Sequence, residues 1–147
     1  MSPIFKKLNL KDQKAILVLN PPKSFEPELD ALTDVTIQRD IESLENIDFS
    51  LAFVTQQAEV DSLANAIAQR AKGDAILWFA YPKASSKNYT CEFNRDTGWA
   101  VLGELGFEGV RQVAIDADWS ALRFRRVEFI KSLTRAKKNR LTKEEKK

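Results

Sequence analysis

Residues 60–82 read VDSLANAIAQRAKGDAILWFAYP, and this stretch decides the fold because two hydrophobic periods follow each other within it. In its first part Val60, Ala64 and Ile67 recur at the three- and four-residue spacing that lines one face of a helix. An unbroken apolar run, Ala75–Tyr81, then follows. A strand that is apolar on both faces is typical of a parallel sheet covered by helices on both sides. The stretch therefore predicts a helix that leads into a buried strand.

Shorter segments on either side continue this alternation. Thr55 is expected to cap the start of the helix and Gly73 to end it. Further strands are predicted at Ala15–Leu19, Val35–Ile37, Phe49–Val54, Val110–Ile115 and Ala121–Val127. Helices are predicted at residues 25–32 and 95–105, after a polar lead-in over residues 1–14. The link between Ile37 and Asp48 is short for a crossover, so either the strand before it is short or a helix is missing. The alternation predicts an α/β fold with three layers and a mostly parallel sheet.

The composition is that of a chain of one domain, and it excludes several chemistries. The 147 residues include 23 Lys or Arg, 21 Asp or Glu and no His, for a formal net charge of +2. Without histidine, Ser-His-Asp and Cys-His catalysis and His-ligated metals are excluded. The lone Cys91 excludes an internal disulfide and a CxxC metal site, so we expect no metal.

Charge divides the chain into an acidic body and a basic tail. Residues 123–147 hold 11 basic and 3 acidic side chains, whereas residues 1–122 hold 12 basic and 18 acidic ones. We expect one α/β domain over residues 1–128 and a basic tail over residues 129–147. The candidates for weak, non-specific nucleic-acid binding are Lys131, Arg135, Lys137, Lys138 and Arg140. No aromatic residue is interleaved among them to stack on bases, so solubility explains the tail equally well.

The N-terminal segment, MSPIFKKLNLKDQK, has no apolar core of the kind that a secretion signal needs. The longest apolar runs, Ala15–Leu19 and Ala75–Tyr81, are far shorter than a membrane span. We therefore expect a cytoplasmic protein that does not associate with membranes.

Two motifs carry a resemblance to a known family. Tyr81–Ser85 reads YPKAS, and Asp118–Phe124 reads DWSALRF. They resemble a bacterial family of unknown function whose members are small single domains with a P-K-x-S loop and a W-S-x-L-R-F strand. The order of elements over residues 12–128 also resembles the class I methyltransferase-like Rossmann fold with one strand–helix unit lost. That resemblance implies the strand order 2-1-3-4-6-5, with an antiparallel last strand that pairs within residues 110–127.

The turn after the first strand departs from a Rossmann cofactor site. Such a site needs glycines there, so that bare backbone and its N–H groups can approach the ligand. Here the turn is Asn20-Pro21-Pro22-Lys23-Ser24-Phe25, and the first glycine of the chain is Gly73. The two prolines also remove two backbone donors. The turn argues against S-adenosylmethionine, NAD, FAD and P-loop nucleotides, so no cofactor is expected. Asp40 or Glu42 imitates the acidic ribose ligand of such sites, although a solvated loop carboxylate is the simpler interpretation.

Candidate ligand-binding residues follow the strands, because ligands of such sheets bind outside the carboxyl ends of the strands. Asn20, Thr55 and Tyr81 occupy those ends. Lys83, Ser85 and Ser86 offer an ammonium group and two hydroxyls that suit a phosphate or carboxylate, unless the loop is simply solvated.

The motif around Trp119 supplies the remaining candidates. Trp119 either caps a pocket by stacking or anchors the hairpin as a buried indole. Asp116 and Asp118 bind a cation, act as a base or simply form the turn, which is the favoured interpretation. Arg123 on an interior strand must be paired or bind an anion, and we expect a salt bridge to Asp116, Asp118 or Glu92.

Three hypotheses for the function follow. The leading one is a non-catalytic binding or regulatory module on a degenerate methyltransferase-like fold, with an anionic small molecule or a protein as its partner. The second is an S-adenosylmethionine-dependent methyltransferase with an atypical cofactor turn. The third is an RNA- or ribosome-associated protein that uses the basic tail.

Overall fold

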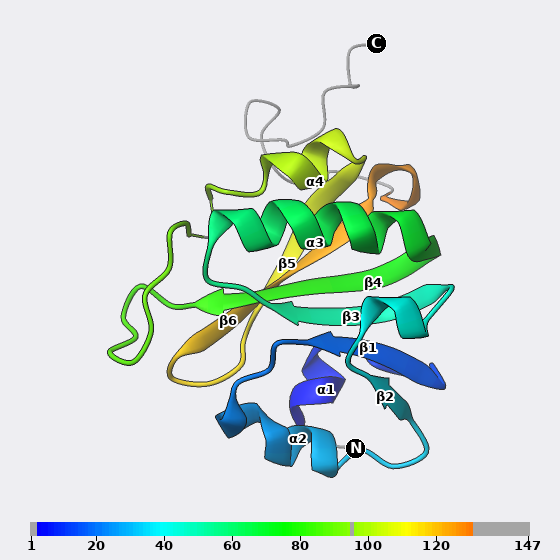
Figure 1. Ribbon diagram of the computed structural model, residues 1–147, viewed down its shortest axis with the longest axis horizontal. Helices are drawn as coiled ribbons and strands as arrows, with labels where there is room; N and C mark the ends of the chain where they lie inside the picture. Colours follow the sequence, from blue (N-terminus) through cyan, green and yellow to red (C-terminus); the bar gives the residue numbers. More distant parts are fainter. Residues whose placement is uncertain (1–2, 95, 131–147) are drawn as a thin grey trace.

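The computed structural model describes residues 3–94 and 96–130 and builds them around one six-stranded sheet (Figure 1). Its strands are β1 (Ala15–Leu19), β2 (Thr36–Gln38), β3 (Ile47–Phe53), β4 (Ala71–Pro82), β5 (Phe107–Ala114) and β6 (Trp119–Arg126). They lie in the order β2-β1-β3-β4-β6-β5. The first four pair in parallel, and β6 is antiparallel to both β4 and β5. The predicted α/β fold, strand order and antiparallel last strand are confirmed.

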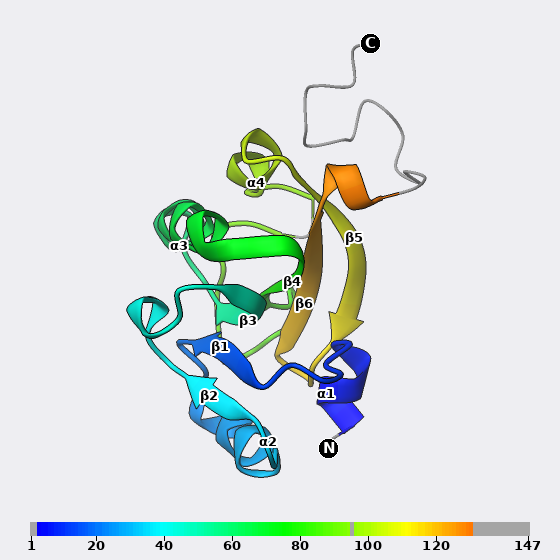
Figure 2. The same ribbon diagram turned by 90° about the vertical axis from the view of Figure 1, so that its right-hand side faces the viewer.

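Helices cover both faces of the sheet, as the buried strands predict (Figure 2). The helices α3 (Gln57–Arg70) and α4 (Ala100–Glu104) pack on one face, together with Leu77, Phe79 and Tyr81 of β4. The short helices α1 (Pro3–Lys7) and α2 (Glu26–Asp30) pack on the other, together with Ile76, Trp78 and Ala80 of the same strand. Neighbouring residues of β4 therefore belong to opposite cores, because side chains alternate along a strand.

Both predicted ends of α3 need correction. Its first turn is closed by Gln56, which exchanges hydrogen bonds with Glu59 in a capping box, and not by Thr55. Its last residue is followed by Ala71, whose extended backbone already begins β4. Gly73 therefore lies inside the strand, where its φ of +55° marks an irregularity of the pairing with β3.

The lead-in predicted over residues 1–14 is wrong in its first part, because α1 forms there. Phe5 and Leu8 are completely buried, and the indole Nε1–H of Trp78 donates a hydrogen bond to the Leu8 carbonyl at 2.8 Å. One turn of helix is too short to show a hydrophobic period, which is why the sequence pattern did not reveal it.

Smaller differences concern the lengths of elements. β2 has three residues, and the 3₁₀ turn η2 (Ile41–Ser43) stands where the missing helix was expected. A 3₁₀ turn, η1 (Lys23–Phe25), precedes α2, and another, η3 (Val127–Phe129), follows β6. α4 starts at Ala100, later than predicted, and β5 starts at Phe107, earlier than predicted.

Among the described residues, no helix has the length and apolarity needed to cross a bilayer. The domain boundary after residue 128 and the cytoplasmic location stay predictions. The nucleic-acid candidates Lys131, Arg135, Lys137, Lys138 and Arg140 lie outside the described residues.

Candidate functional site

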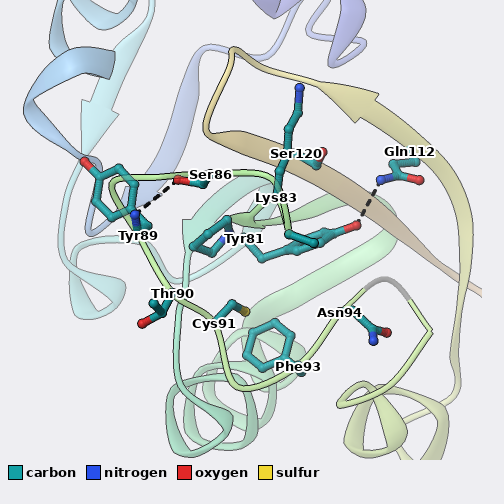
Figure 3. Close-up of a pocket in the computed structure, with 12 residues that line it drawn as sticks. Tyr81, Lys83, Ser86, Tyr89, Thr90, Cys91, Phe93, Asn94, Gln112 and Ser120 are labelled. Carbon is teal, nitrogen blue, oxygen red and sulfur yellow. Dashed lines mark hydrogen bonds between the residues drawn. The ribbon is translucent and has the colours of Figure 1, made fainter.

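A pocket of about 630 Å³ opens where β4 ends, and we call it the β4 pocket (Figure 3). Its volume lies in the range of sites that hold small molecules. The end of β4, the loop after it and the neighbouring strands β5 and β6 build its wall. The lining residues are Tyr81, Pro82, Lys83, Ala84, Ser86, Tyr89, Thr90, Cys91, Phe93, Asn94, Gln112 and Ser120.

Tyr81 forms a rigid part of this wall. Its ring meets Trp99 edge to face, with the ring centroids 5.6 Å apart. At the far end of the ring, Gln112 Nε2 donates a hydrogen bond to the Tyr81 hydroxyl at 3.0 Å. The Phe93 ring lies beside Tyr81 and is itself held by Trp99 at 5.0 Å between centroids. A side chain fixed at both ends presents a preformed surface to a ligand.

Among the described residues that line the β4 pocket, Lys83 is the charged one, and none carries a carboxylate. The Lys83 backbone N–H donates to the carbonyl of Asp118 at 2.7 Å, which fixes the start of the loop against the hairpin of β5 and β6. Burial raises the pKa of the nearby Cys91 thiol, and the carboxylates of Glu92 and Glu59 raise it further against an opposing backbone hydrogen bond. The thiol is therefore protonated and neutral at neutral pH, and it lacks the lowered pKa of a reactive cysteine.

A set of hydrogen bonds centred on Asp118 and Ser86, which we call the latch, holds the loop after β4 in place. The Asp118 carboxylate accepts hydrogen bonds from the Ser86 hydroxyl at 2.8 Å and from Asn88 Nδ2 at 3.2 Å. Ser86 Oγ in turn accepts from the backbone N–H groups of Asn88 and Tyr89. Asp116 Oδ1 accepts from the N–H groups of Asp118 and Trp119, so Asp116 forms the turn between the strands.

Trp119 does not line the β4 pocket, because it points to the opposite face of the sheet. It is 3% exposed and packs between the rings of Phe53 and Tyr89, with centroids 5.1 and 4.9 Å away. Of the two interpretations, the buried indole describes its position. Its Nε1 has no hydrogen-bond partner among the described residues.

Arg123 lies on that same opposite face, and its expected partners are wrong. Asp116 and Asp118 serve the turn and the latch, and Glu92 accepts a hydrogen bond from the N–H of Gln57. Burial lowers the pKa of the Arg123 guanidinium, and the neighbouring Arg125 and Arg111 lower it further against the attraction of Asp74. That carboxylate is bound by Arg125. Sequence alone could not place these groups, because the register of β6 against β4 decides them.

The remaining candidates do not line the β4 pocket. Asn20 is an exposed residue at the end of β1 with a φ of +56°. Thr55 follows β3, where its N–H donates to Glu59 Oε1 at 2.8 Å and its carbonyl accepts from the N–H of Glu92 in the pocket loop at 3.1 Å. Ser85 is an exposed residue of the same loop, outside the lining. The structure thus brings Tyr81, Lys83 and Ser86 from the predicted set into the lining and leaves the other five outside it.

Other lining residues were missed by the sequence analysis. Gln112 and Ser120 come from β5 and β6, and their place follows from strand pairing alone. Thr90, Phe93 and Asn94 lie in a loop whose course no local pattern specifies.

The turn after β1 does not fit a cofactor held in the manner of a Rossmann site. Asn20 supplies the left-handed backbone that a glycine would give. Pro21 and Pro22 have no N–H, and the N–H of Phe25 is already donated to the Pro22 carbonyl at 2.9 Å. The first turn of α2 carries Glu26, which is paired with Arg39 at 2.8 Å, and Glu28, which repels an anionic group. No step of a reaction is therefore assigned to such a cofactor.

No protein-family model matches this sequence, and no curated protein matches it. Among solved structures, an S-adenosylmethionine-dependent methyltransferase from Aquifex aeolicus is similar with a TM-score of 0.56 and 13% identity, covering 84% of this chain and 88% of that one. The pyocyanin biosynthetic protein PhzM is similar with a TM-score of 0.52 and 13% identity over 80% of this chain and 52% of its own. A third similar structure is that of phosphoethanolamine N-methyltransferase 2 of Haemonchus contortus, in complex with phosphomonomethylethanolamine and S-adenosylhomocysteine. Its TM-score is 0.50 and its identity 10%, over 79% of this chain and 34% of its own.

At identities this low the similarity concerns the fold. The comparisons therefore support the predicted fold and leave the choice between the three hypotheses for the function to the residues of the site. The described part of this chain has the class I methyltransferase-like Rossmann fold, with a pocket at the end of β4.

Proposed function

We propose that this protein is a binding module that holds a small molecule in the β4 pocket of a methyltransferase-like fold. The observation that carries the proposal is the pocket itself, whose wall is fixed before any ligand arrives. Tyr81 is held by Trp99 and Gln112, and the loop is held by the latch on Asp118. Preformed sites bind more tightly because less ordering accompanies binding.

The chemistry of the lining supports binding rather than proton transfer. Carboxylates and imidazoles are the side chains that most often act as bases at neutral pH. The lining residues that the structure describes include neither, and Cys91 is kept protonated by its raised pKa. A non-catalytic module needs no such base.

Protein-observed NMR with a library of small metabolites tests the proposal on the full chain. We expect shift changes that cluster at Tyr81, Lys83 and Ser120. Ala84→Trp fills the pocket from an exposed position, so it should abolish these changes. Ala117→Trp places the same side chain on an exposed turn outside the lining and should leave them intact. Changes that cluster instead at Asn20 would overturn the proposal.

A second candidate is an S-adenosylmethionine-dependent methyltransferase with an atypical cofactor turn. The observation that favours it is the similarity to the Aquifex aeolicus methyltransferase over most of both chains. In that case the β4 pocket would hold the methyl acceptor. Transfer of the labelled methyl group of S-adenosylmethionine to any member of the metabolite library, lost in Ala84→Trp, would establish this candidate.

A further inference from the structure

The charge of the β4 pocket is unbalanced in a way that selects its ligand. Lys83 contributes a positive charge, and the described lining residues include no carboxylate to offset it. Among the described residues Lys83 forms no ion pair. Two carboxylates lie just outside this lining and face other donors, because Asp118 accepts hydrogen bonds from Ser86 and Asn88, and Glu92 accepts one from the N–H of Gln57. An ammonium group in a half-enclosed site attracts a negatively charged group of the ligand.

Aromatic rings form part of the rest of the wall, beside polar side chains such as Asn94 and Gln112. Tyr81 and Phe93 are 4% and 7% exposed, so each presents only a small part of its surface to the pocket. Trp99 holds both rings at centroid distances of 5.6 and 5.0 Å. Fixed aromatic rings of this kind suit a flat apolar body, because ring contacts add to the free energy of burial. Figure 3 shows the Tyr81 ring lying along the pocket, with Phe93 beside it.

We propose that the β4 pocket is selective for a small monocarboxylic acid with a flat apolar body. The carboxylate lies on the Lys83 ammonium, and the body lies against Tyr81 and Phe93. This inference rests on the proposed function and names the class of its ligand. The hydroxyls of Thr90 and Ser120 are further donors within the lining.

The same lining disfavours a phosphate dianion. A dianion in this site would leave one negative charge without a partner, and a partly buried unpaired charge is costly. No arginine is among the described lining residues, so none of them offers the planar fork with which arginine binds phosphate. A carboxylate, with a single charge, is matched by the single ammonium group.

Calorimetric titration of the full chain with three probes tests the class of ligand. The probes are 3-phenylpropionate, its neutral amide 3-phenylpropionamide, and phenyl phosphate. We expect the acid to bind at least about tenfold more tightly than either of the others, since a charge-assisted hydrogen bond is worth that factor. Lys83→Gln should weaken binding of the acid by a similar factor and leave the affinity for the amide unchanged. Lys87→Gln, in the same loop but outside the lining, is the matched control and should change neither.

The outcomes separate this inference from the function on which it rests. Equal affinity for acid and amide, or an acid affinity unaffected by Lys83→Gln, overturns the inference while the pocket stays a binding site. Tighter binding of phenyl phosphate overturns it as well. If no probe binds and the metabolite library produces no shift changes at Tyr81, the proposed function itself fails.

Discussion

Removing the Asp118 carboxylate should loosen the wall of the β4 pocket without unfolding the protein. In Asp118→Ala, the hydrogen bonds from the Ser86 hydroxyl at 2.8 Å and from Asn88 Nδ2 at 3.2 Å are lost. Hydrogen bonds to charged groups contribute about 1.5–3 kcal/mol each when shielded. The second of these two is exposed, so we expect a total loss of about 1–2 kcal/mol after allowing for solvent. For a chain of this size, that lowers Tm by about 3–8 °C.

Calorimetry gives Tm, and NMR shows whether the loop has moved. The amide signals of Ser86 and Tyr89 should shift in Asp118→Ala, while those of α3 stay in place. Asp48→Ala removes an exposed carboxylate that makes no hydrogen bond among the described residues, so it serves as the control. The Tm of the isosteric variant Asp118→Asn should lie between those of Asp118→Ala and Asp48→Ala. An unchanged Tm together with unchanged Ser86 and Tyr89 signals would refute the latch.

Three further perturbations test other parts of the structure. Phe5→Ala should lower the free energy of unfolding by about 3–5 kcal/mol because the ring is completely buried, and a loss below about 1 kcal/mol in urea titrations would show that α1 does not dock. The hydrogen bond from Arg125 lowers the pKa of Asp74 in the folded state. The pair therefore stabilises the fold at pH values above the unfolded-state pKa of that carboxyl, and this stabilisation is lost as pH falls through the lower folded-state pKa. Asp74→Asn should therefore lower the free energy of unfolding by less than about 1 kcal/mol at neutral pH, because both side chains are about one-third exposed. It should not change the free energy of unfolding in strong acid, and an equal loss at both pH values would contradict this. Cys91 should react with iodoacetamide more slowly than free cysteine at neutral pH because partial burial raises its pKa, and a rate equal to that of free cysteine would count against its half-buried position.

The sheet could be predicted because its strands carry local signals. The run Ala75–Tyr81 is apolar on both faces, and only a strand between two helical layers buries it fully. The helical spacing of Val60, Ala64 and Ile67 marks the helix that precedes it, and all three are buried in the same core. The antiparallel last strand came from the resemblance of the element order, since no local pattern specifies strand direction.

The site could be predicted only in part, because its composition depends on strand pairing. Trp119 and Ser120 are neighbours in sequence, yet Ser120 lines the β4 pocket and Trp119 is buried on the opposite face. Which of two alternating side chains faces a pocket is fixed by register, and register is a property of the assembled sheet. Lys83 was recognised because it directly follows the end of a strand, whereas Gln112 reaches the site from a strand with no motif of its own.

Titration of the full chain with S-adenosylmethionine, followed by calorimetry and NMR, bears most directly on where this fold binds its ligand. If the site lies beyond β4, S-adenosylmethionine at about 1 mM gives no saturable heat and no shift changes at Asn20 or Asp40. Saturable one-to-one binding with shift changes at these two residues would show that a nucleoside does rest on the proline turn, and would contradict the account.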